Sequence, residues 1–193
     1  MADLLILASR SPRRRELLQS VGLRFDIAAP DIDERVRRGE APRAYVKRLA
    51  RAKAMAVQAG PSTAVLAADT TVVVGGKILG KPRDRAEAAR MLRALSGRAH
   101  HVYTGLAARR GEKILSQVER TQVWFKALTR AEIAWYVALP EPYDKAGGYA
   151  IQGTAGAFVV RIAGSYSNVV GLPLHAALEL LAAVGHPLPW SAR

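Results

Sequence analysis

Apolar and polar residues alternate in blocks along this chain, and the blocks predict a mixed α/β fold. Short apolar runs have the length and composition of strands over residues 4–8, 24–29, 63–68 and 157–163. Longer segments with a helical repeat of apolar residues predict helices over residues 12–21, 42–59 and 173–184. The second helix shows that repeat in Tyr45, Leu49, Ala52 and Ala56.

Two further helices are marked by the residues that begin them. Asp84 is followed three residues later by Glu87, and Thr129 by Glu132. This is the spacing of a capping box, in which each side chain bonds the other residue's backbone N–H. The second box precedes a helix predicted over residues 133–139.

Glycines that interrupt an alternation of apolar and polar residues indicate turns between paired strands. Residues 71–79 read as a hairpin turned at Gly75 and Gly76. Residues 99–109 and 113–126 read as a long antiparallel pair that turns near Gly111. We therefore expect an α/β fold with a long, partly antiparallel mixed sheet flanked by helices.

Composition narrows the functional classes. The chain has 193 residues, 50% of them hydrophobic, and this length suits one domain or two small lobes. It has no cysteine, which excludes disulfides, thiolate zinc sites and cysteine nucleophiles. No apolar run approaches a membrane span, and the apolar start is too short for a signal peptide. The net charge of +13 favours an anionic partner, although drift in arginine content would give the same value.

The first candidate site is a basic turn before a helix. Ser9 precedes Ser11, which suits the cap position, and Pro12 suits the first turn. Arg13 and Arg14 follow at a helix end that exposes free N–H groups, so the turn is a candidate phosphate site. A solvated basic helix face is the alternative.

The second candidate is Asp69, which follows an apolar strand and precedes Thr70. Ligands of open α/β sheets bind beyond the carboxyl ends of strands, so Asp69 lies where a catalytic group is expected. It would otherwise make a turn or capping bond.

Three charged residues have weaker support. Lys81, between a glycine and a proline, would place a point charge on a phosphate, or would lie in an exposed loop. Lys53 borders its helix's apolar stripe, where it would line a cleft or extend to solvent. The acidic cluster with Glu34 would hold a divalent cation, or would be a solvated loop that offsets nearby positive charge.

The glycine-rich stretch 141–153 looks like a loop built around a ligand, although a structural turn is equally consistent. Its Gln152 carries an amide that can read a base edge through paired hydrogen bonds. The four histidines have no metal-type partner at ligand spacing, and we expect them to be structural.

Taken together, these segments resemble the Maf family of nucleoside triphosphate pyrophosphatases. The matching segments occur in the family's order over nearly the whole chain: residues 7–18, 68–73, 80–82, 95–97, 144–149, 151–153 and 169–174. The resemblance implies one Maf-like domain over residues 1–193, with two lobes around a cleft and a fold related to the inosine triphosphate pyrophosphatases. It also implies a cytoplasmic location and a homodimer.

The activity implied by the resemblance is hydrolysis of a nucleoside triphosphate to the monophosphate and pyrophosphate with Mg²⁺ or Mn²⁺. Asp69 matches the family's catalytic aspartate, and Lys53, Lys81 and Glu34 match other active-site residues. We assign Glu34 and Asp69 as the expected metal ligands.

The family's subgroups differ in the base they accept. Arg13, Thr70 and Gln152 match the subgroup that acts on dTTP and UTP. The subgroup that prefers 7-methyl-GTP has tryptophan, glutamine and glutamate at those positions. The resemblance therefore implies a pyrimidine enzyme, and modified pyrimidine nucleotides are a further possible substrate.

Two other classes of function stay open. The charge of +13 also suits a nucleic-acid-binding module, but only 6% of residues are aromatic and they do not interleave with the basic clusters. A nucleotide-binding regulatory protein linked to cell division is the other alternative. We expect no membrane and no nucleic-acid partner.

Overall fold

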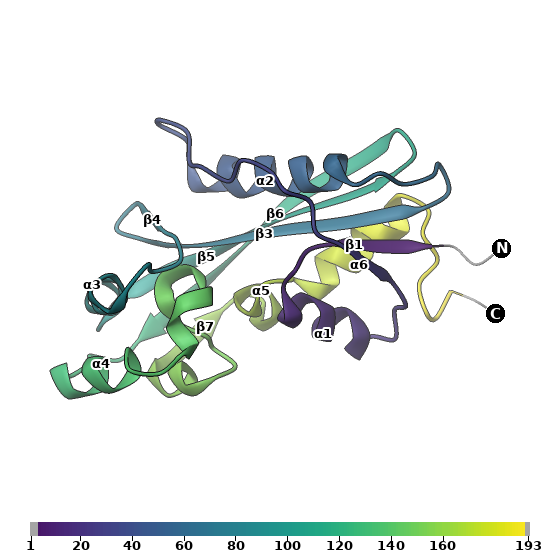
Figure 1. Cartoon of the computed structure of the whole chain (residues 1–193). Coiled ribbons are helices and arrows are strands. Elements are labelled where there is room, and N and C mark those ends of the chain that lie inside the picture. The colour runs from purple at the N-terminus through teal and green to yellow at the C-terminus, as the bar shows by residue number, and fades with distance from the viewer. Residues whose placement is uncertain (1–3, 192–193) are drawn as a thin grey trace. The chain divides into compact units, whose positions relative to one another are not determined.

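The computed structural model describes residues 4–191 (Figure 1). Its elements follow in this order: β1 (Leu5–Ala8), α1 (Pro12–Ser20), β2 (Asp26–Ala28), α2 (Pro42–Ala56), β3 (Ala64–Val74), β4 (Lys77–Leu79), α3 (Arg85–Leu95), β5 (Ala99–Arg110), β6 (Lys113–Phe125), α4 (Arg130–Tyr136), the 3₁₀ helices η1 (Glu141–Asp144), η2 (Ala146–Gly148) and η3 (Thr154–Phe158), β7 (Val159–Ala163), α5 (Tyr166–Val170) and α6 (Leu174–Ala183).

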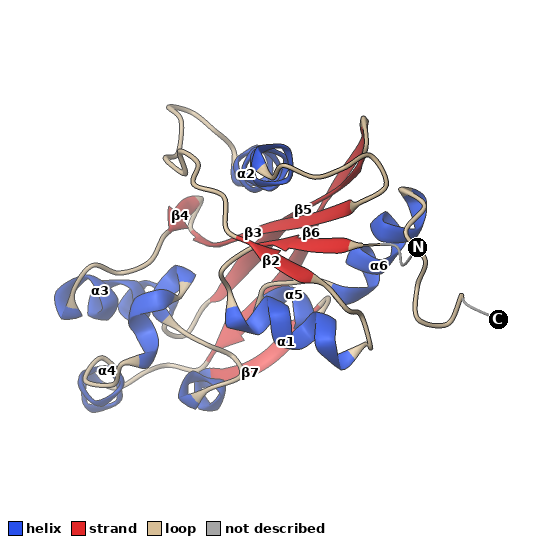
Figure 2. Ribbon diagram, turned by 45° about the vertical axis from the view of Figure 1, so that its right-hand side comes forward, coloured by secondary structure: helices blue, strands red, loops and turns tan. Residues whose placement is uncertain are grey.

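The strands form a mixed seven-stranded sheet in the order β2-β1-β3-β5-β6-β7, with β4 paired to β3. Figure 2 draws these strands in red and the helices in blue. β1 pairs parallel with both β2 and β3. The β3–β4 and β6–β7 pairs are antiparallel. This confirms the α/β class and the partly antiparallel sheet that the sequence predicts.

The chain divides into two compact units. Unit 1 comprises the described residues up to Asp69, Thr104–Glu119 and the described residues from Gly171. Unit 2 comprises Thr70–Tyr103 and Arg120–Val170.

Unit 1 has helices on both faces of its part of the sheet. Alternate strand residues point to opposite faces, so Leu66 of β3 packs with α1 and α6, and its neighbour Ala67 packs with α2. Fully buried helix residues on the first face are Leu18, Ala177 and Leu181, and on the second face Ala50 and Ala54. The small residues of the second face let α2 lie close to the strands.

Unit 2 has one apolar core between its strands and the helices α3 and α4. Four buried aromatic side chains belong to this core: Phe125, Tyr136, Tyr149 and Phe158. Tyr136 and Phe158 pack edge to face with ring centroids 5.3 Å apart. This packing joins α4 to the segment before β7.

The structure corrects the expected elements at several places. β3 continues through Asp69 to Val74, because the β-branched run that follows Asp69 stays in the sheet instead of turning into a separate hairpin strand. α2 ends at Ala56, before the expected residue 59. Three short 3₁₀ helices occupy the region 141–158, where the sequence predicts a loop over residues 141–153 and a strand from residue 157.

The helix caps are confirmed in position, with differences in detail. Thr129 and Glu132 form the full capping box. Asp84 accepts from the N–H of Glu87, whereas the Glu87 carboxylate accepts from Arg83. Ser11 is the cap residue of α1, but its side chain makes no capping bond.

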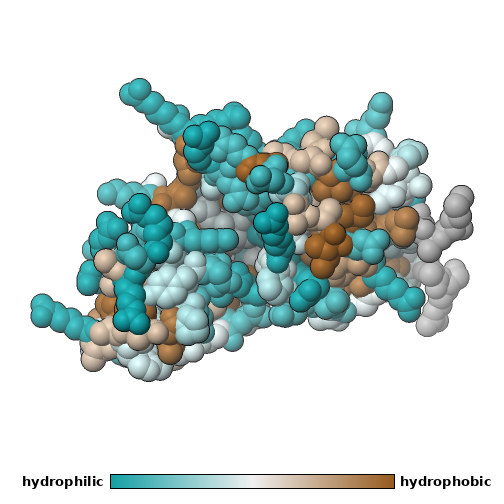
Figure 3. Space-filling view, viewed as in Figure 1, coloured by the Kyte–Doolittle hydropathy of each residue, from teal (hydrophilic) through white to brown (hydrophobic). Residues whose placement is uncertain are grey.

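On the face drawn in Figure 3, hydrophilic side chains predominate and apolar patches interrupt them. Charged residues of both signs, 23% of the sequence, contribute to that polar character. Within residues 4–191, none of the helices combines the length and the apolar character needed to cross a bilayer.

Candidate active site

In unit 1, two carboxylates converge on one lysine. The Nζ of Lys53 lies 2.6 Å from Oδ1 of Asp69 and 2.7 Å from Oε1 of Glu34. The Lys53 and Asp69 side chains are each 11% exposed, whereas that of Glu34 is 57% exposed. The three residues come from α2, β3 and the loop between β2 and α2, so the fold brings together groups that lie far apart in the sequence.

A close backbone approach places Lys53 against the sheet. A Cβ atom on Gly105 of β5 would lie 2.2 Å from the carbonyl oxygen of Val46 in α2. Only glycine permits this approach, so α2 rests directly on β5 there. Lys53 lies two helical turns further along, and its ammonium reaches Asp69.

The charge of Asp69 is set by opposing effects. Burial raises the pKa of Asp69 above its usual value, and the ammonium of Lys53 and the guanidinium of Arg14 partly offset that rise. Glu34 adds to the rise. A carboxylate whose pKa lies above the usual range is a stronger base than a solvated aspartate, which suits proton abstraction.

The buried side chain of Arg14 contacts the backbone next to Asp69. Its Nε donates to the carbonyl of Gly171 at 2.8 Å, and its Nη1 donates to Oγ of Ser9 at 3.0 Å and to the carbonyl of Ala68 at 2.9 Å. Burial lowers the pKa of Arg14, and the charge of Asp69 raises it. Arg14 thus ties the turn at Ser9 and the residue before Asp69 to the segment before α6.

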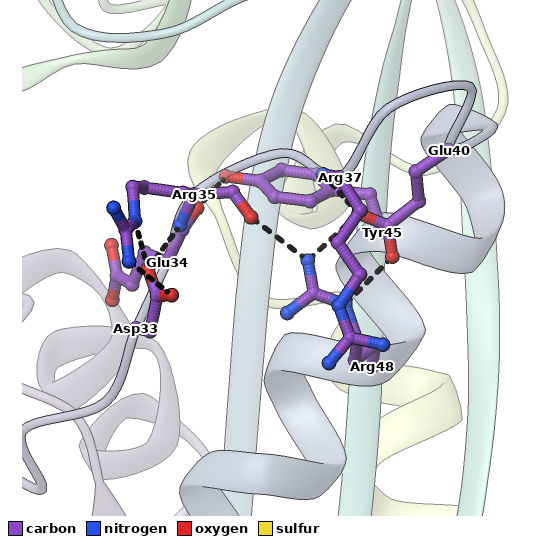
Figure 4. Close-up of polar contacts among 7 residues, drawn as sticks. All are labelled: Asp33, Glu34, Arg35, Arg37, Glu40, Tyr45 and Arg48. Atoms are coloured by element: carbon purple, nitrogen blue, oxygen red, sulfur yellow. Dashed lines mark hydrogen bonds and ion pairs between the residues drawn. The ribbon is translucent and has the colours of Figure 1, made fainter.

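The loop that carries Glu34 is held to α2 by polar contacts (Figure 4). The hydroxyl of Tyr45 donates to the carbonyl of Glu34 at 2.9 Å. Arg48 donates to the carbonyl of Arg35 at 3.0 Å and forms two bonds with Glu40, at 2.6 and 2.7 Å. The hydrogen bond from Arg48 lowers the pKa of Glu40 to about 2. Glu34 therefore reaches Lys53 from a loop with a defined path.

Four other predicted residues are placed as follows. Arg13 is partly buried on α1 in unit 1. In unit 2, Thr70 follows Asp69 in β3, and Lys81 lies in the exposed loop between β4 and α3. Gln152, also in unit 2, is exposed just before η3.

The loop of Lys81 is held by a backbone hydrogen bond to another segment of unit 2. The N–H of Gly147 donates to the carbonyl of Gly80 at 2.9 Å. Gly147 has φ +72°, and a Cβ there would meet the side chain of Val72 at 2.9 Å. The glycine-rich stretch after α4 thus fits closely against the residues before Lys81.

Asp69 and Glu34 are the carboxylates of unit 1 that could hold a divalent cation. Asp69 and Glu34 already direct one oxygen each at a single cationic group, the ammonium of Lys53. Among the described residues, no group of three or more histidine, cysteine, aspartate or glutamate side chains meets as a metal cage. Mg²⁺ commonly binds through one or two carboxylates together with substrate phosphates, and this donor set matches that pattern.

Sequence reasoning placed Tyr45 in the apolar stripe of its helix, whereas its hydroxyl holds the Glu34 loop. It did not single out Arg48, Glu40 or the carboxylate of Glu141. It assigned Arg14 to the ligand, although Arg14 shares the buried side of α1 with Leu18. The four-residue spacing of Arg14 and Leu18 on a helix was the available signal, because residues at that spacing share one face.

Comparison with known proteins identifies the family to which this chain is similar. The Maf family profile, described as "Maf-like protein", matches residues 4–184. A dTTP/UTP pyrophosphatase of Anaeromyxobacter dehalogenans (strain 2CP-C) is 57% identical over 194 residues, covering 98% of each chain. A dTTP/UTP pyrophosphatase of Myxococcus xanthus (strain DK1622) is 56% identical over 191 residues, covering 98% of this chain and 96% of its own.

Among solved structures, the Staphylococcus aureus Ham1 protein aligns with a TM-score of 0.48 and 13% identity, covering 93% of this chain and 96% of its own. A HAM1 protein from Coxiella burnetii aligns with a TM-score of 0.44 and 20% identity, covering 67% and 76%. The family assignment comes from the sequence matches.

Proposed function

This chain belongs to the Maf family, and from that premise we propose that it hydrolyses dTTP and UTP to the nucleoside monophosphate and pyrophosphate. The observation that carries the proposal is the convergence of Asp69 and Glu34 on Lys53, which supplies a base and a cation-binding pair in one place. The names of the relatives from Anaeromyxobacter and Myxococcus support the choice of substrates.

In the proposed reaction, a water molecule attacks the α-phosphorus and the bond to the bridging oxygen of the β-phosphate breaks. Asp69 accepts the proton of that water, and pyrophosphate leaves with the electron pair. Lys53 and Arg14 favour the ionised form of Asp69, so the carboxylate is ready to accept the proton.

Energy considerations favour a divalent cation in this reaction. A free aspartate has a pKa of about 3.9 and water of about 15.7, a gap worth roughly 16 kcal/mol. Mg²⁺ or Mn²⁺, held by Glu34, Asp69 and the phosphates, would lower the pKa of the attacking water and so reduce this gap.

The remaining residues take substrate-binding roles in the proposal. Arg13, Lys53 and Lys81 bind phosphate oxygens and offset charge on the leaving pyrophosphate. Thr70 and Gln152 contact the pyrimidine base. Ser9 and Arg14 fix the basic turn that precedes α1. The hydrogen bonds of Arg14 to protein groups favour this role over direct contact with the substrate.

A nucleotide panel tests the proposal. Pyrophosphate release is measured with dTTP, UTP, CTP, ATP, GTP and 7-methyl-GTP, each with Mg²⁺, with Mn²⁺ and with EDTA. We expect the highest kcat/KM for dTTP and UTP, and loss of activity with EDTA. Equal rates on all bases would contradict the pyrimidine assignment, and full activity with EDTA would contradict the metal. A homodimer and a cytoplasmic location remain predictions from the family resemblance.

A salt-sensitive gel shift with nucleic acid, in the absence of pyrophosphate release, would instead favour the nucleic-acid-binding alternative. Nucleotide binding without turnover would favour the regulatory alternative.

A further inference from the structure

We propose that Glu141 is a positioning residue for base selection, because its carboxylate holds the turn that presents Gln152. The inference rests on the proposed function, in which Gln152 contacts the pyrimidine. Every contact that carries it lies within unit 2.

Gln152 sits in a tight turn. The N–H of Gly153 donates to the carbonyl of Ala150 at 3.1 Å, which makes Ile151 and Gln152 the two central residues of a four-residue turn. Gln152 is exposed. The direction of its amide therefore depends on how the backbone around the turn is held.

The carboxylate of Glu141 binds the chain directly after that turn. Its Oε2 accepts from the N–H of Thr154 at 2.9 Å, and its Oε1 accepts from the N–H of Ala155 at 3.2 Å. The hydroxyl of Tyr136 donates to the same Oε1 at 2.7 Å. One carboxylate thus satisfies two backbone donors of η3 and one buried side chain.

The surroundings of Glu141 favour the ionised form of its carboxylate. Burial raises the pKa of Glu141, but the hydrogen bonds from Tyr136, Thr154 and Ala155 outweigh this effect, and its pKa lies below the usual value. Burial and the bond to Glu141 raise the pKa of Tyr136. Tyr136 therefore stays a hydrogen-bond donor, and Glu141 stays an acceptor.

Gly153 shows how closely the anchor fits the turn. A Cβ added at Gly153 would lie 2.2 Å from Oε2 of Glu141. The glycine lies between Gln152 and the two amides that Glu141 binds, so the carboxylate occupies the place of a side chain at that position. Moving the carboxylate would move the turn.

The anchor is itself fixed to the core of unit 2. Tyr136 is fully buried at the end of α4, and its ring packs edge-on against Phe158 at the end of η3. The chain from α4 to Glu141 and the chain from Gln152 to Phe158 are therefore joined at two points, by the hydrogen bonds of Glu141 and by these two rings. A turn held at its following residues can keep one orientation while a base binds, and small displacements of such contacts reduce rates strongly.

The variant Glu141→Gln tests the inference in the full-length protein. A carboxamide has one acceptor oxygen where the carboxylate has two, so it cannot satisfy all three donors. We expect kcat/KM for UTP to fall about tenfold while kcat/KM for CTP changes little. An amide held in one orientation matches the N3–H donor and O4 acceptor of uracil, whereas cytosine presents an acceptor and a donor in the reverse order. Gln152→Ala should give the same loss, and the double variant should lose no further selectivity.

Two further variants separate positioning from general stability. Gly153→Ala places a methyl group where the carboxylate of Glu141 lies, so it displaces that carboxylate and should lower the UTP to CTP ratio as Glu141→Gln does. Glu132→Gln is the matched control, since Glu132 caps α4 in the same unit without a bond to the turn, and its ratio should equal that of the wild type. Hydrogen exchange of the Thr154 and Ala155 amides should accelerate in Glu141→Gln.

An equal fall for UTP and CTP in Glu141→Gln, or an unchanged ratio, would overturn the inference and leave the proposed function standing. Additive losses in the double variant would also overturn it, because Glu141 would then act apart from Gln152. A wild-type protein without preference for UTP over CTP would overturn both.

Discussion

Arg48 and Glu40 form an ion pair through two parallel hydrogen bonds, and this pair closes the loop that carries Glu34 (Figure 4). The same guanidinium donates to the backbone of Arg35, next to Glu34. Arg48 and Lys53 belong to one helix. Helix α2 therefore supplies Lys53 and also positions the loop whose Glu34 carboxylate contacts that lysine.

Arg48→Lys should lower kcat/KM for UTP by about tenfold. Lysine keeps the charge but loses the fork that binds Glu40 and the Arg35 carbonyl together, and groups that orient metal ligands commonly have effects of this size. Steady-state kinetics at several Mg²⁺ concentrations measures the change. Arg35→Ala is the control: it removes an exposed pair with Asp33 and keeps the carbonyl that Arg48 binds. Equal kinetics for Arg48→Lys and the wild type would remove the pair from the site.

Asp69→Asn should lower kcat by at least about a hundredfold, because the amide cannot accept the proton of the attacking water. Binding of a non-hydrolysable UTP analogue, followed by calorimetry, should persist. Near-normal turnover in this variant would refute the role of Asp69 as the base.

Lys81→Ala should raise KM and lower kcat for UTP, since a phosphate contact acts on both the bound nucleotide and the leaving pyrophosphate. The exposed Lys77, in the neighbouring strand β4, provides a charge-matched control as Lys77→Ala. If both variants behave as the wild type, Lys81 does not bind the substrate.

His100 should make the protein less stable in mild acid. Burial is the main cause that lowers its pKa to about 4, and the charge of His101 adds to this effect. The unfolded chain has a histidine pKa near 6.5, so it binds the proton first as the pH falls. Stability from this residue is complete above about pH 6.5 and declines toward pH 4, by about 2 kcal/mol at pH 5.

Urea unfolding at pH 7.5 and pH 5 measures that loss, and His100→Gln should show a smaller difference between the two pH values. An equal difference in the variant and the wild type would assign the acid sensitivity to other groups.

Gly105→Ala should destabilise the protein by about 3 kcal/mol, because the added methyl would overlap the backbone of α2 at Val46. Gly60→Ala is the control, since its nearest neighbour would lie 3.9 Å away, at Thr63. Thermal unfolding distinguishes the two. A neutral Gly105→Ala would show that α2 can move away from β5 at little cost.

The sequence predicts well that α2 and the strands around Leu66 form. The apolar stripe that it predicts for α2 is wrong except at Leu49, because the buried face is Val46, Leu49, Ala50 and Ala54, whereas Tyr45 and Ala52 are half-buried and Ala56 is exposed. It mistakes the end of β3, because Asp69 resembles a turn residue when its neighbours in the sheet are unknown. Local patterns do not report that β4 pairs with Val72–Val74 at the end of β3, and tertiary pairing outweighs local preference there.

The candidate site shows the same division. Asp69, Lys53 and Glu34 can be proposed from motif and residue type, but their meeting depends on a close approach of α2 to Gly105. The roles of Arg48 and Glu141 rest on contacts with backbone groups distant in the sequence, which leave no local pattern. Arg14 is charged and belongs to a basic turn, so its burial becomes evident only from the helix face that it shares with Leu18.

The boundary between the two units has a consequence for protein engineering. Asp69 and Thr70 are consecutive in β3, and the boundary also divides β5 after Tyr103 and β6 after Glu119. Gene shuffling between relatives that aims to exchange base preference would have to recombine inside three strands of a continuous sheet. Single-residue exchanges at the turn around Gln152 avoid such breaks, and they offer the more direct way to redesign which nucleotide is cleaved.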